Sequence, residues 1–281
     1  LGIISALVGR NDYVILDKED HASIYDACRL SYGKLLRYEH NDMEALERCL
    51  QRVPESAGAL IVTDGLFSMS GDIANLPEIV RLAKTYGARV MVDDAHGLGT
   101  LGKGGRGTPS HFGMEQEVDV YMGTFSKSLA SLGGYMAGKS RIVDYVRHNS
   151  RPFIFSASVP PASCAAALAA LNVLEEEPEL PERLLRLSDF FREALKQRGM
   201  SIRESRTPIV PIFTYTADRT LRIAMELYKQ GLFVNTVLPP AAPADGCMLR
   251  TSLMATLTES LLEEAADILS RVLSMPEYAM K

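Results

Sequence analysis

Cysteine, excess basic charge and long apolar runs are all scarce in this sequence of 281 residues. The four cysteines lie far apart and form no CxxC pair, so we expect neither a disulfide framework nor a structural zinc site. Cysteine usage of this kind fits a reducing, cytoplasmic location better than an oxidising, extracellular one. With 30 Lys and Arg against 35 Asp and Glu, the net charge is −5, which argues against nucleic acid and anionic membrane surfaces as partners. The most apolar stretch, residues 164–174, is too short to span a bilayer.

The remaining composition is typical of a packed protein. Hydrophobic residues make up 47% and charged residues 23%, and a chain of this length can form one large domain or a large domain with a small one. The first residue is Leu1 rather than Met, and residues 1–8 have a helical pattern without the cationic region or cleavage site of a signal peptide. We therefore expect the natural protein to carry a further segment before Leu1.

Short β-branched runs alternate with amphipathic helical patterns in the first part of the chain. The pattern predicts strands at residues 13–16, 34–38, 59–63, 89–92 and 118–122, with helices at 21–31, 42–52 and 76–86. Strands separated by helices in this way predict βαβ crossovers and an α/β domain with a mostly parallel sheet.

The pattern changes after residue 160. Long helical patterns at 162–174, 181–199, 220–230 and 259–273 surround predicted strands at 209–215 and 248–253. We therefore predict a large domain at residues 1–172 and a smaller C-terminal α+β domain at residues 173–281.

Gly97, Gly99 and Gly102 match the G-x-G-x-x-G spacing of dinucleotide-binding turns. That motif also needs a helix that begins at the third glycine and an acid that ends the next strand. Here residues 103–107 contain three more glycines, which disfavour a helix, and Asp119 begins the next predicted strand. We therefore do not expect a nicotinamide site.

Asp93 and His96 follow the predicted strand at 89–92, where open α/β sheets bind their ligands. A tight turn can bring both side chains into one pocket. The alternative is an acid that caps a helix, with a histidine nearby by chance.

Lys127 follows the next predicted strand among small and hydroxylic residues, and the stretch from Leu129 to Gly134 is uncharged. Such surroundings should remove water from the ammonium group and lower its pKa, as Schiff-base lysines require. The alternative is a solvated surface lysine. An aspartate and a lysine at two strand ends suggest pyridoxal 5′-phosphate (PLP), with Asp93 protonating the pyridine nitrogen and Lys127 forming the Schiff base.

These residues belong to six motifs that occur in order along the chain. They are 20–23 (Asp-His-Ala-Ser), 64–72 (Asp-Gly-Leu-Phe-Ser-Met-Ser-Gly-Asp), 93–97 (Asp-Asp-Ala-His-Gly), 124–127 (Thr-Phe-Ser-Lys), 151–156 (Arg-Pro-Phe-Ile-Phe-Ser) and 249–252 (Leu-Arg-Thr-Ser). Together they resemble the α-oxoamine synthases, which are PLP-dependent enzymes of the fold-type I aminotransferase superfamily. One departure is Asp64, where many members carry glutamate.

The resemblance implies a role for each residue at the cofactor. Lys127 would carry PLP, Asp93 would pair with the ring nitrogen, and His96 would bond the phenolic oxygen. Thr124 would lie near that oxygen or the phosphate, and His21 would stack on the ring.

The resemblance also implies contacts at the edges of the site. Ser68 would lie beside the cofactor, and Arg250 would hold the carboxylate of the amino acid. Ser126, with Ser156 or Ser158 of the partner subunit, would contact the phosphate. His21, Ser68 and Arg250 could instead have purely structural roles.

The reaction that the resemblance implies joins an amino acid to an acyl-CoA or an acyl carrier protein. Lys127 would take the α-proton, His96 or His21 would donate to the thioester carbonyl, and CoA and CO2 would leave. The resemblance further implies a homodimer in which residues 151–158 cross to the partner.

The choice of substrate is less determined. Residues 124–134 look most like bacterial serine palmitoyltransferases, which favours L-serine and a long-chain acyl-CoA. The form of residues 93–97 is shared with 8-amino-7-oxononanoate synthases, which leaves L-alanine and a pimeloyl thioester as the alternative. Ala95 and Gly97 disfavour a 2-amino-3-ketobutyrate CoA ligase, His21 disfavours a plain aminotransferase, and Lys127 disfavours a non-catalytic partner subunit.

Overall fold

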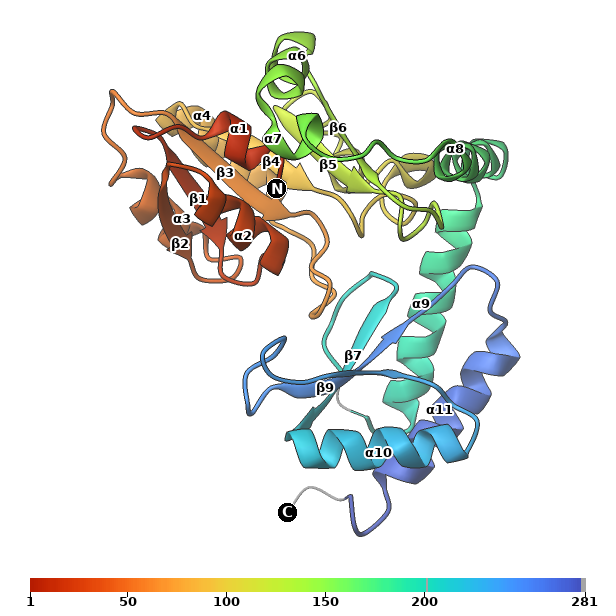
Figure 1. Cartoon of the computed structure of the whole chain (residues 1–281). Helices are drawn as coiled ribbons and strands as arrows, with labels where there is room; N and C mark the ends of the chain where they lie inside the picture. The colour runs from red at the N-terminus through yellow and green to blue at the C-terminus, as the bar shows by residue number, and fades with distance from the viewer. Residues whose placement is uncertain (201, 279–281) are drawn as a thin grey trace. The chain divides into compact units, whose positions relative to one another are not determined.

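A computed structural model describes residues 1–200 and 202–278 and divides the chain into two compact units (Figure 1). The larger unit contains residues 1–67 and 73–178. The smaller unit contains residues 68–72 and the chain from residue 179 onward. The short segment 68–72 therefore belongs with a part of the chain that begins more than a hundred residues later.

The larger unit is built on a six-stranded sheet in the order β2-β1-β3-β4-β5-β6. Neighbouring strands from β2 to β5 are parallel, and β6 runs antiparallel to β5. The strands are β1 (Tyr13–Asp17), β2 (Lys34–Tyr38), β3 (Ala59–Asp64), β4 (Arg89–Asp93), β5 (Val120–Thr124) and β6 (Gly134–Gly138). The helices are α1 (Ile4–Leu7), α2 (Ala22–Leu30), α3 (Met43–Leu50), α4 (Leu76–Tyr86), α5 (Thr108–His111), α6 (Ser140–Asn149), α7 (Arg151–Ile154) and α8 (Pro161–Glu176), with one 3-10 turn, η1 (Lys103–Gly105).

Both faces of this sheet are covered, which explains the nearly continuous apolar runs of its central strands. Side chains alternate between the faces along each strand. Ile15, Ile61 and Val90 pack into a core with helices α3 and α4, whereas Val14 and Val62 pack into a second core with α1 and α2.

The smaller unit has a three-stranded antiparallel sheet in the order β7-β9-β8, with three long helices. Its core joins Val210 and Leu249 of the sheet to Phe191 and Leu269 of the helices. The elements are α9 (Leu180–Gln197), β7 (Ile209–Tyr215), α10 (Ala217–Lys229), β8 (Asn235–Val237), β9 (Cys247–Ser252) and α11 (Glu259–Leu273).

The predicted fold class is confirmed: a mostly parallel sheet in a large unit and a smaller α+β unit. The sequence missed strands β6 and β8 and helix α6. The predicted boundary after residue 172 differs from the structure, because α8 continues to Glu176 and the division follows Pro178. Within the described residues, no helix combines the length and the apolar character that crossing a membrane requires.

Candidate active site

Parallel pairing places the carboxyl ends of β1, β3, β4 and β5 along one edge of the large sheet. Asp64 ends β3, Asp93 ends β4 and Thr124 ends β5, and Lys127 follows three residues later. His21 lies between β1 and α2 at the same edge. The structure therefore brings together predicted site residues that are far apart in the sequence.

Asp93 is a buried carboxylate, with 6% of its surface exposed. Its Oδ1 accepts a hydrogen bond from the backbone N–H of Ala95 (3.1 Å). Burial raises the pKa of Asp93, and the hydrogen bond from Ala95 and the charges of Lys127 and His21 oppose that rise. Both basic groups therefore lie close enough to act on this carboxylate. Asp93 also lines a cavity of about 500 Å³, together with Met122.

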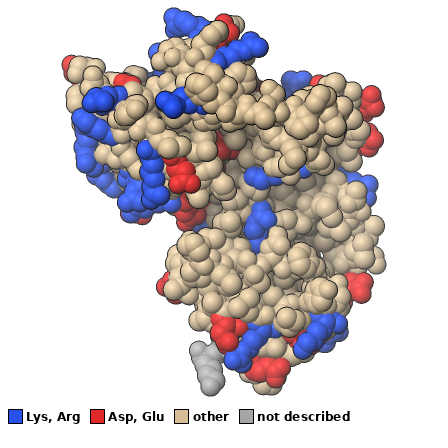
Figure 2. All heavy atoms as spheres, viewed as in Figure 1, with Lys and Arg blue, Asp and Glu red and all other residues tan. Residues whose placement is uncertain are grey.

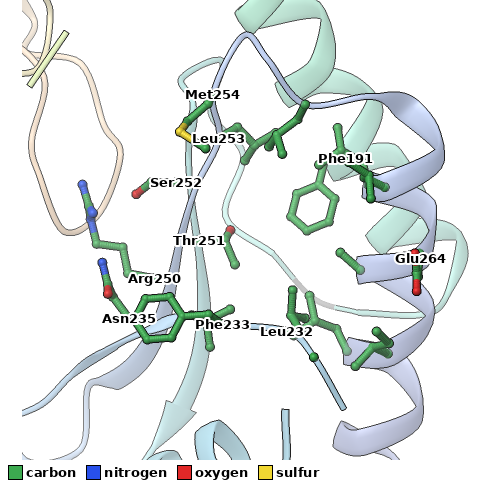
Figure 3. A pocket seen from close by; sticks show the side chains of 18 of the residues that line it. Phe191, Leu232, Phe233, Asn235, Arg250, Thr251, Ser252, Leu253, Met254 and Glu264 are labelled. Atoms are coloured by element: carbon green, nitrogen blue, oxygen red, sulfur yellow. The ribbon is translucent and has the colours of Figure 1, made fainter. Parts of the chain in front are cut away.

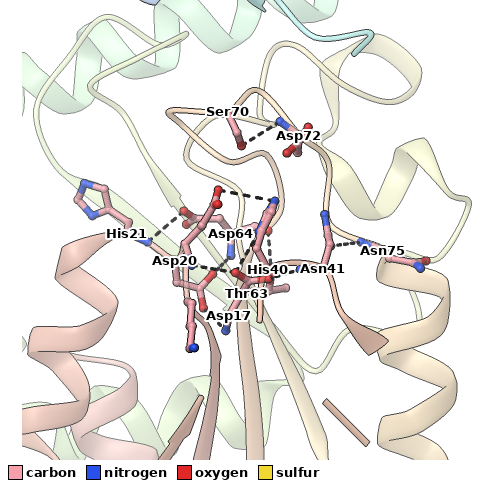
Figure 4. Close-up of polar contacts among 12 residues, drawn as sticks. Asp17, Asp20, His21, His40, Asn41, Thr63, Asp64, Ser70, Asp72 and Asn75 are labelled. Carbon is pink, nitrogen blue, oxygen red and sulfur yellow. Dashed lines mark hydrogen bonds and ion pairs between the residues drawn. The ribbon is translucent and has the colours of Figure 1, made fainter. Parts of the chain in front are cut away.

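Two further buried carboxylates, Asp20 and Asp64, lie at the same edge (Figure 4). The backbone N–H groups of Asp64 and Asp17 donate to Asp20 (2.8 and 3.0 Å), and the N–H of His21 donates to Asp64 (3.1 Å). Burial and the neighbouring carboxylates raise the pKa of both Asp20 and Asp64 well above the usual range, while Lys127 opposes the rise at Asp64. These bonds fix the backbone at His21.

His21 is the N-cap residue of α2, and its ring is held by Ser23. The backbone N–H of Ser23 donates to Nδ1 of His21 (3.2 Å), and the Ser23 hydroxyl lies 2.8 Å from the same nitrogen. Because Nδ1 accepts a hydrogen bond, it carries a lone pair, and the proton of the neutral ring is on Nε2. The ring itself is exposed.

Lys127 lies in a loop that is organised by hydroxyl groups and is exposed. Thr124 Oγ1 donates to the carbonyl of Gly133 (3.0 Å) and lies 2.9 Å from the hydroxyl of Ser126. The Ser128 hydroxyl donates to the carbonyl of Leu98 (2.8 Å), in the turn that also contains His96. The expectation that this loop removes water from Lys127 is wrong for the structure, because the neighbouring side chains are small and leave the lysine accessible.

The glycine-rich loop after β4 allows the loop that contains Lys127 to pack closely against it. Gly99 has φ +78°, and a Cβ on it would lie 2.4 Å from the Cβ of Ser128, so the loop that contains Lys127 can approach only a glycine. Asp94, which is buried beside this loop, accepts hydrogen bonds from the N–H (2.7 Å) and hydroxyl (2.6 Å) of Thr108. Burial raises the pKa of Asp94 to about 6.

No regular α-helix begins at Gly102, where a nucleotide-binding turn would need one, because only the 3-10 turn η1 follows.

Comparison with known proteins shows the family to which the chain belongs. The family model described as aminotransferase class I and II matches residues 1–269. Serine palmitoyltransferase of Sphingobacterium spiritivorum is 48% identical over 277 residues, which cover 99% of this chain and 69% of that protein. The 8-amino-7-oxononanoate synthase of Citrifermentans bemidjiense is also 48% identical, over 96% of this chain and 70% of that protein. A solved structure of serine palmitoyltransferase with a PLP internal aldimine has a TM-score of 0.95 and 36% identity, and covers 99% of this chain and 70% of that chain.

The chain belongs to the α-oxoamine synthases of the aminotransferase class I and II family. Its fold is therefore PLP fold type I, and its cofactor is PLP. The residues at the sheet edge fit that cofactor. Asp93 is a buried carboxylate that can face a cationic ring nitrogen, and Lys127 is an exposed amine whose charge opposes the rise that burial causes in the pKa of Asp93.

In this α-oxoamine synthase, two of the predicted residues, Ser68 and Arg250, lie in the smaller unit. The Nε–H of Arg250 donates to the backbone carbonyl of Ser68 (2.5 Å), and burial lowers the pKa of the Arg250 guanidinium. Arg250 is at the edge of an apolar cavity of about 530 Å³, and Figure 3 shows its side chain directed away from Leu253 and Phe191 of the lining.

Sequence reasoning missed the residues that support the site. Asp20 precedes His21 in a motif, but nothing in the sequence shows that its carboxylate accepts hydrogen bonds from the backbone of two strands. Ser23 and Ser128 are likewise ordinary loop or helix-start serines until their acceptors are known. The spacing of His21 and Ser23 at a helix start is the one local signal that could have been used.

Proposed function

We propose that this enzyme condenses L-serine with a long-chain acyl-CoA and releases CoA and CO2. The observation that carries the proposal is the convergence of Lys127, Asp93 and His21 at one edge of the sheet. Sequence identity of 48% to a serine palmitoyltransferase supports the choice of substrates. Equal identity to an 8-amino-7-oxononanoate synthase keeps L-alanine with a pimeloyl thioester as the second candidate.

When bound, PLP supplies an electron sink that stabilises negative charge at the α-carbon of an amino acid. Asp93 would hold the proton at the ring nitrogen, since a buried carboxylate next to a cationic ring keeps its own charge. Lys127 would bind the cofactor through Nζ, and the free amine would then accept the α-proton. Thr124 and Ser126 would hold the phosphate side of the cofactor.

The remaining residues act on the substrates. His21 presents Nε2–H outward, so it can pack against the cofactor ring or donate to a carbonyl oxygen as charge develops there. His96 lies two residues before Leu98, whose carbonyl accepts a hydrogen bond from Ser128, and it would hold the phenolic oxygen. Arg250 can bind a carboxylate by two parallel hydrogen bonds, which a lysine cannot reproduce.

We further propose a homodimer in a reducing, cytoplasmic compartment. Leu168 on α8 is 59% exposed, and Phe155 in the preceding segment is 78% exposed. Figure 2 shows few charged side chains over α8. Exposed apolar surface of this extent is typical of a protein–protein contact. All four cysteines are free, which fits a reducing compartment.

An assay of CoA release tests the proposal. The enzyme is incubated with L-serine, L-alanine or glycine against short and long acyl-CoA donors and against an acyl carrier protein donor. We expect the fastest release with L-serine and a long-chain acyl-CoA. Faster release with L-alanine and a pimeloyl thioester would select the second candidate, and transamination without CoA release would exclude both.

A further inference from the structure

Residues 68–72 are packed as part of the smaller unit, although the chain on either side belongs to the larger one. Phe67 is buried in the core of the larger unit. Met69 instead packs against Val237 and Met248, which are in the sheet of the smaller unit. We call residues 68–72 the inserted segment.

Three polar contacts hold the C-terminal end of the inserted segment. The hydroxyls of Ser205 and Thr207 both donate to the carbonyl of Gly71 (2.7 and 2.8 Å), and Arg203 forms an ion pair with Asp72 (3.0 Å). Thr207 is fully buried. Gly71 has φ +73°, and a Cβ on it would lie 2.7 Å from a backbone carbonyl, so the contact requires glycine. Two hydroxyl donors on one carbonyl leave the position of this residue well determined.

One further contact holds the other end. The Nε–H of Arg250 donates to the carbonyl of Ser68. A guanidinium is planar, so a hydrogen bond at Nε fixes the plane and therefore the direction of its two Nη groups. Arg250 also has a defined place on β9, where it pairs with Pro211 of β7 and Asn235 of β8. The strand pairing thus fixes the backbone of Arg250, and the carbonyl of Ser68 orients its side chain.

We propose that Ser205 and Thr207 are positioning residues, which anchor the inserted segment so that the Ser68 carbonyl orients Arg250 toward the carboxylate of the amino acid. The contribution of Ser68 is then its backbone carbonyl. This inference rests on the proposed function of Arg250 as the carboxylate-binding residue. It predicts that two hydroxyls that never touch the substrate control how well the enzyme distinguishes a carboxylate from a neutral amide.

The test uses the PLP-loaded protein and compares L-serine with L-serinamide, which has the same side chain but no carboxylate. Dissociation constants come from the change in cofactor absorbance on titration. The double variant Ser205→Ala/Thr207→Val should lose preference for L-serine over L-serinamide by about tenfold, as expected when one charge-assisted contact is misaligned. The single variant Thr207→Ser retains a hydroxyl at this position and should keep most of the wild-type preference for L-serine over L-serinamide.

Thr214→Val is the matched control. Thr214 is also buried in the smaller unit, but its hydroxyl lies 2.6 Å from that of Thr220 and donates to the carbonyl of Cys247 (3.2 Å) rather than to the inserted segment. This variant should keep the wild-type preference. If the double variant keeps the preference too, or if Thr214→Val loses it equally, the inference is wrong.

A further variant covers the case in which the double variant does not fold. Arg203→Gln removes the partly exposed ion pair with Asp72 and should lower the same preference by a smaller factor. An unchanged preference in Arg203→Gln would overturn the inference.

Arg250→Lys separates this inference from the proposed function. If the substitution leaves the preference for the carboxylate unchanged, Arg250 does not bind it, and both the proposed role and the inference fail. If Arg250→Lys abolishes the preference and the double variant does not alter it, only the inference fails. The titrations are repeated with L-alanine and L-alaninamide, so that a wrong choice of amino acid does not affect the result.

Discussion

The carboxylates and the lysine of this site are held in opposite ways. Asp20, Asp64 and Asp93 are each at most 6% exposed and accept hydrogen bonds from backbone N–H groups. Lys127 is exposed in a loop whose order comes from hydroxyl groups and from glycine contacts. The three aspartates are thus buried at the edge of the sheet, whereas the lysine lies on the surface of the protein.

Substitutions in the two regions should therefore have different effects. A buried carboxylate that accepts backbone hydrogen bonds contributes to folding as well as to chemistry, so its replacement should change both. An exposed lysine contributes less to folding, because solvent screens its charge, so its replacement should change the chemistry far more than the stability. The charge of Lys127 nevertheless lowers the pKa of both Asp64 and Asp93, so the two regions act on one site.

The largest effect is expected for Lys127→Ala. Loss of the amine should abolish the visible absorbance of the bound cofactor and reduce turnover by about 1000-fold or more, within the range for loss of a catalytic base and covalent attachment. Circular dichroism of the apo protein should stay unchanged, and its unfolding midpoint should fall by less than that of Asp93→Asn, because the Lys127 side chain is exposed and solvent screens its charge. Lys139→Ala, at another exposed lysine, serves as the control. A large loss of stability in Lys127→Ala would contradict the distinction between the two regions.

A stability effect is expected from Asp94, which is buried beside the glycine-rich loop. Its folded-state pKa of about 6 lies above the usual aspartate value of 3.8, so its contribution to stability is complete below pH 3.8 and is lost as pH rises through 6. The loss should be on the order of 3 kcal/mol of unfolding free energy. Asp94→Asn should lack this component, and urea unfolding of both proteins between pH 4 and pH 7 measures it. Parallel pH profiles would show that the carboxylate is not buried as described.

Asp93→Asn should retain the cofactor but slow exchange of the α-proton by about 10- to 100-fold. Asparagine cannot keep the pyridine nitrogen protonated, and a charge-assisted hydrogen bond contributes about 1.5–3 kcal/mol. Exchange is followed by NMR in deuterated buffer, with Asp94→Asn as the neighbouring control. Wild-type exchange in Asp93→Asn, together with slow exchange in Asp94→Asn, would assign the role to Asp94.

The smallest effect concerns α8, which is joined to the lysine loop by a hydrogen bond from the Ser131 hydroxyl to the Ser163 carbonyl (2.6 Å). Leu168→Glu should weaken the proposed dimer by about 1–2 kcal/mol, since it introduces a charge into an apolar contact. Light scattering over a dilution series measures the dissociation. Leu221→Glu, at an exposed leucine of α10, should leave the mass unchanged. A wild-type protein that is monomeric and active would exclude the proposed dimer.

Much of the fold could be predicted because the central strands are apolar on both faces and the helices between them are amphipathic. Strand β6 was missed because it has glycine at both ends, and β8 because it has only three residues. The place of residues 68–72 could not be predicted, since Gly71 and its partner Ser205 are 134 positions apart. No local pattern encodes a contact over that distance.

The positions of Asp93 and Lys127 beside neighbouring strand ends were predictable from the sequence, and their roles at the cofactor stay predictions. The family resemblance added His21, His96 and Arg250. The hydrogen bonds that connect Asp20, Asp64 and His21 were not predictable, because they depend on how the turn after β1 meets the end of β3.

The most direct test of the central claim is to find which lysine holds the cofactor. The PLP-loaded enzyme is reduced with borohydride, digested and analysed by mass spectrometry for a pyridoxyl-modified peptide. We expect a single modified peptide that contains Lys127, and no such peptide from Lys127→Ala. Modification of a different lysine in the wild-type enzyme would contradict the assignment of the site.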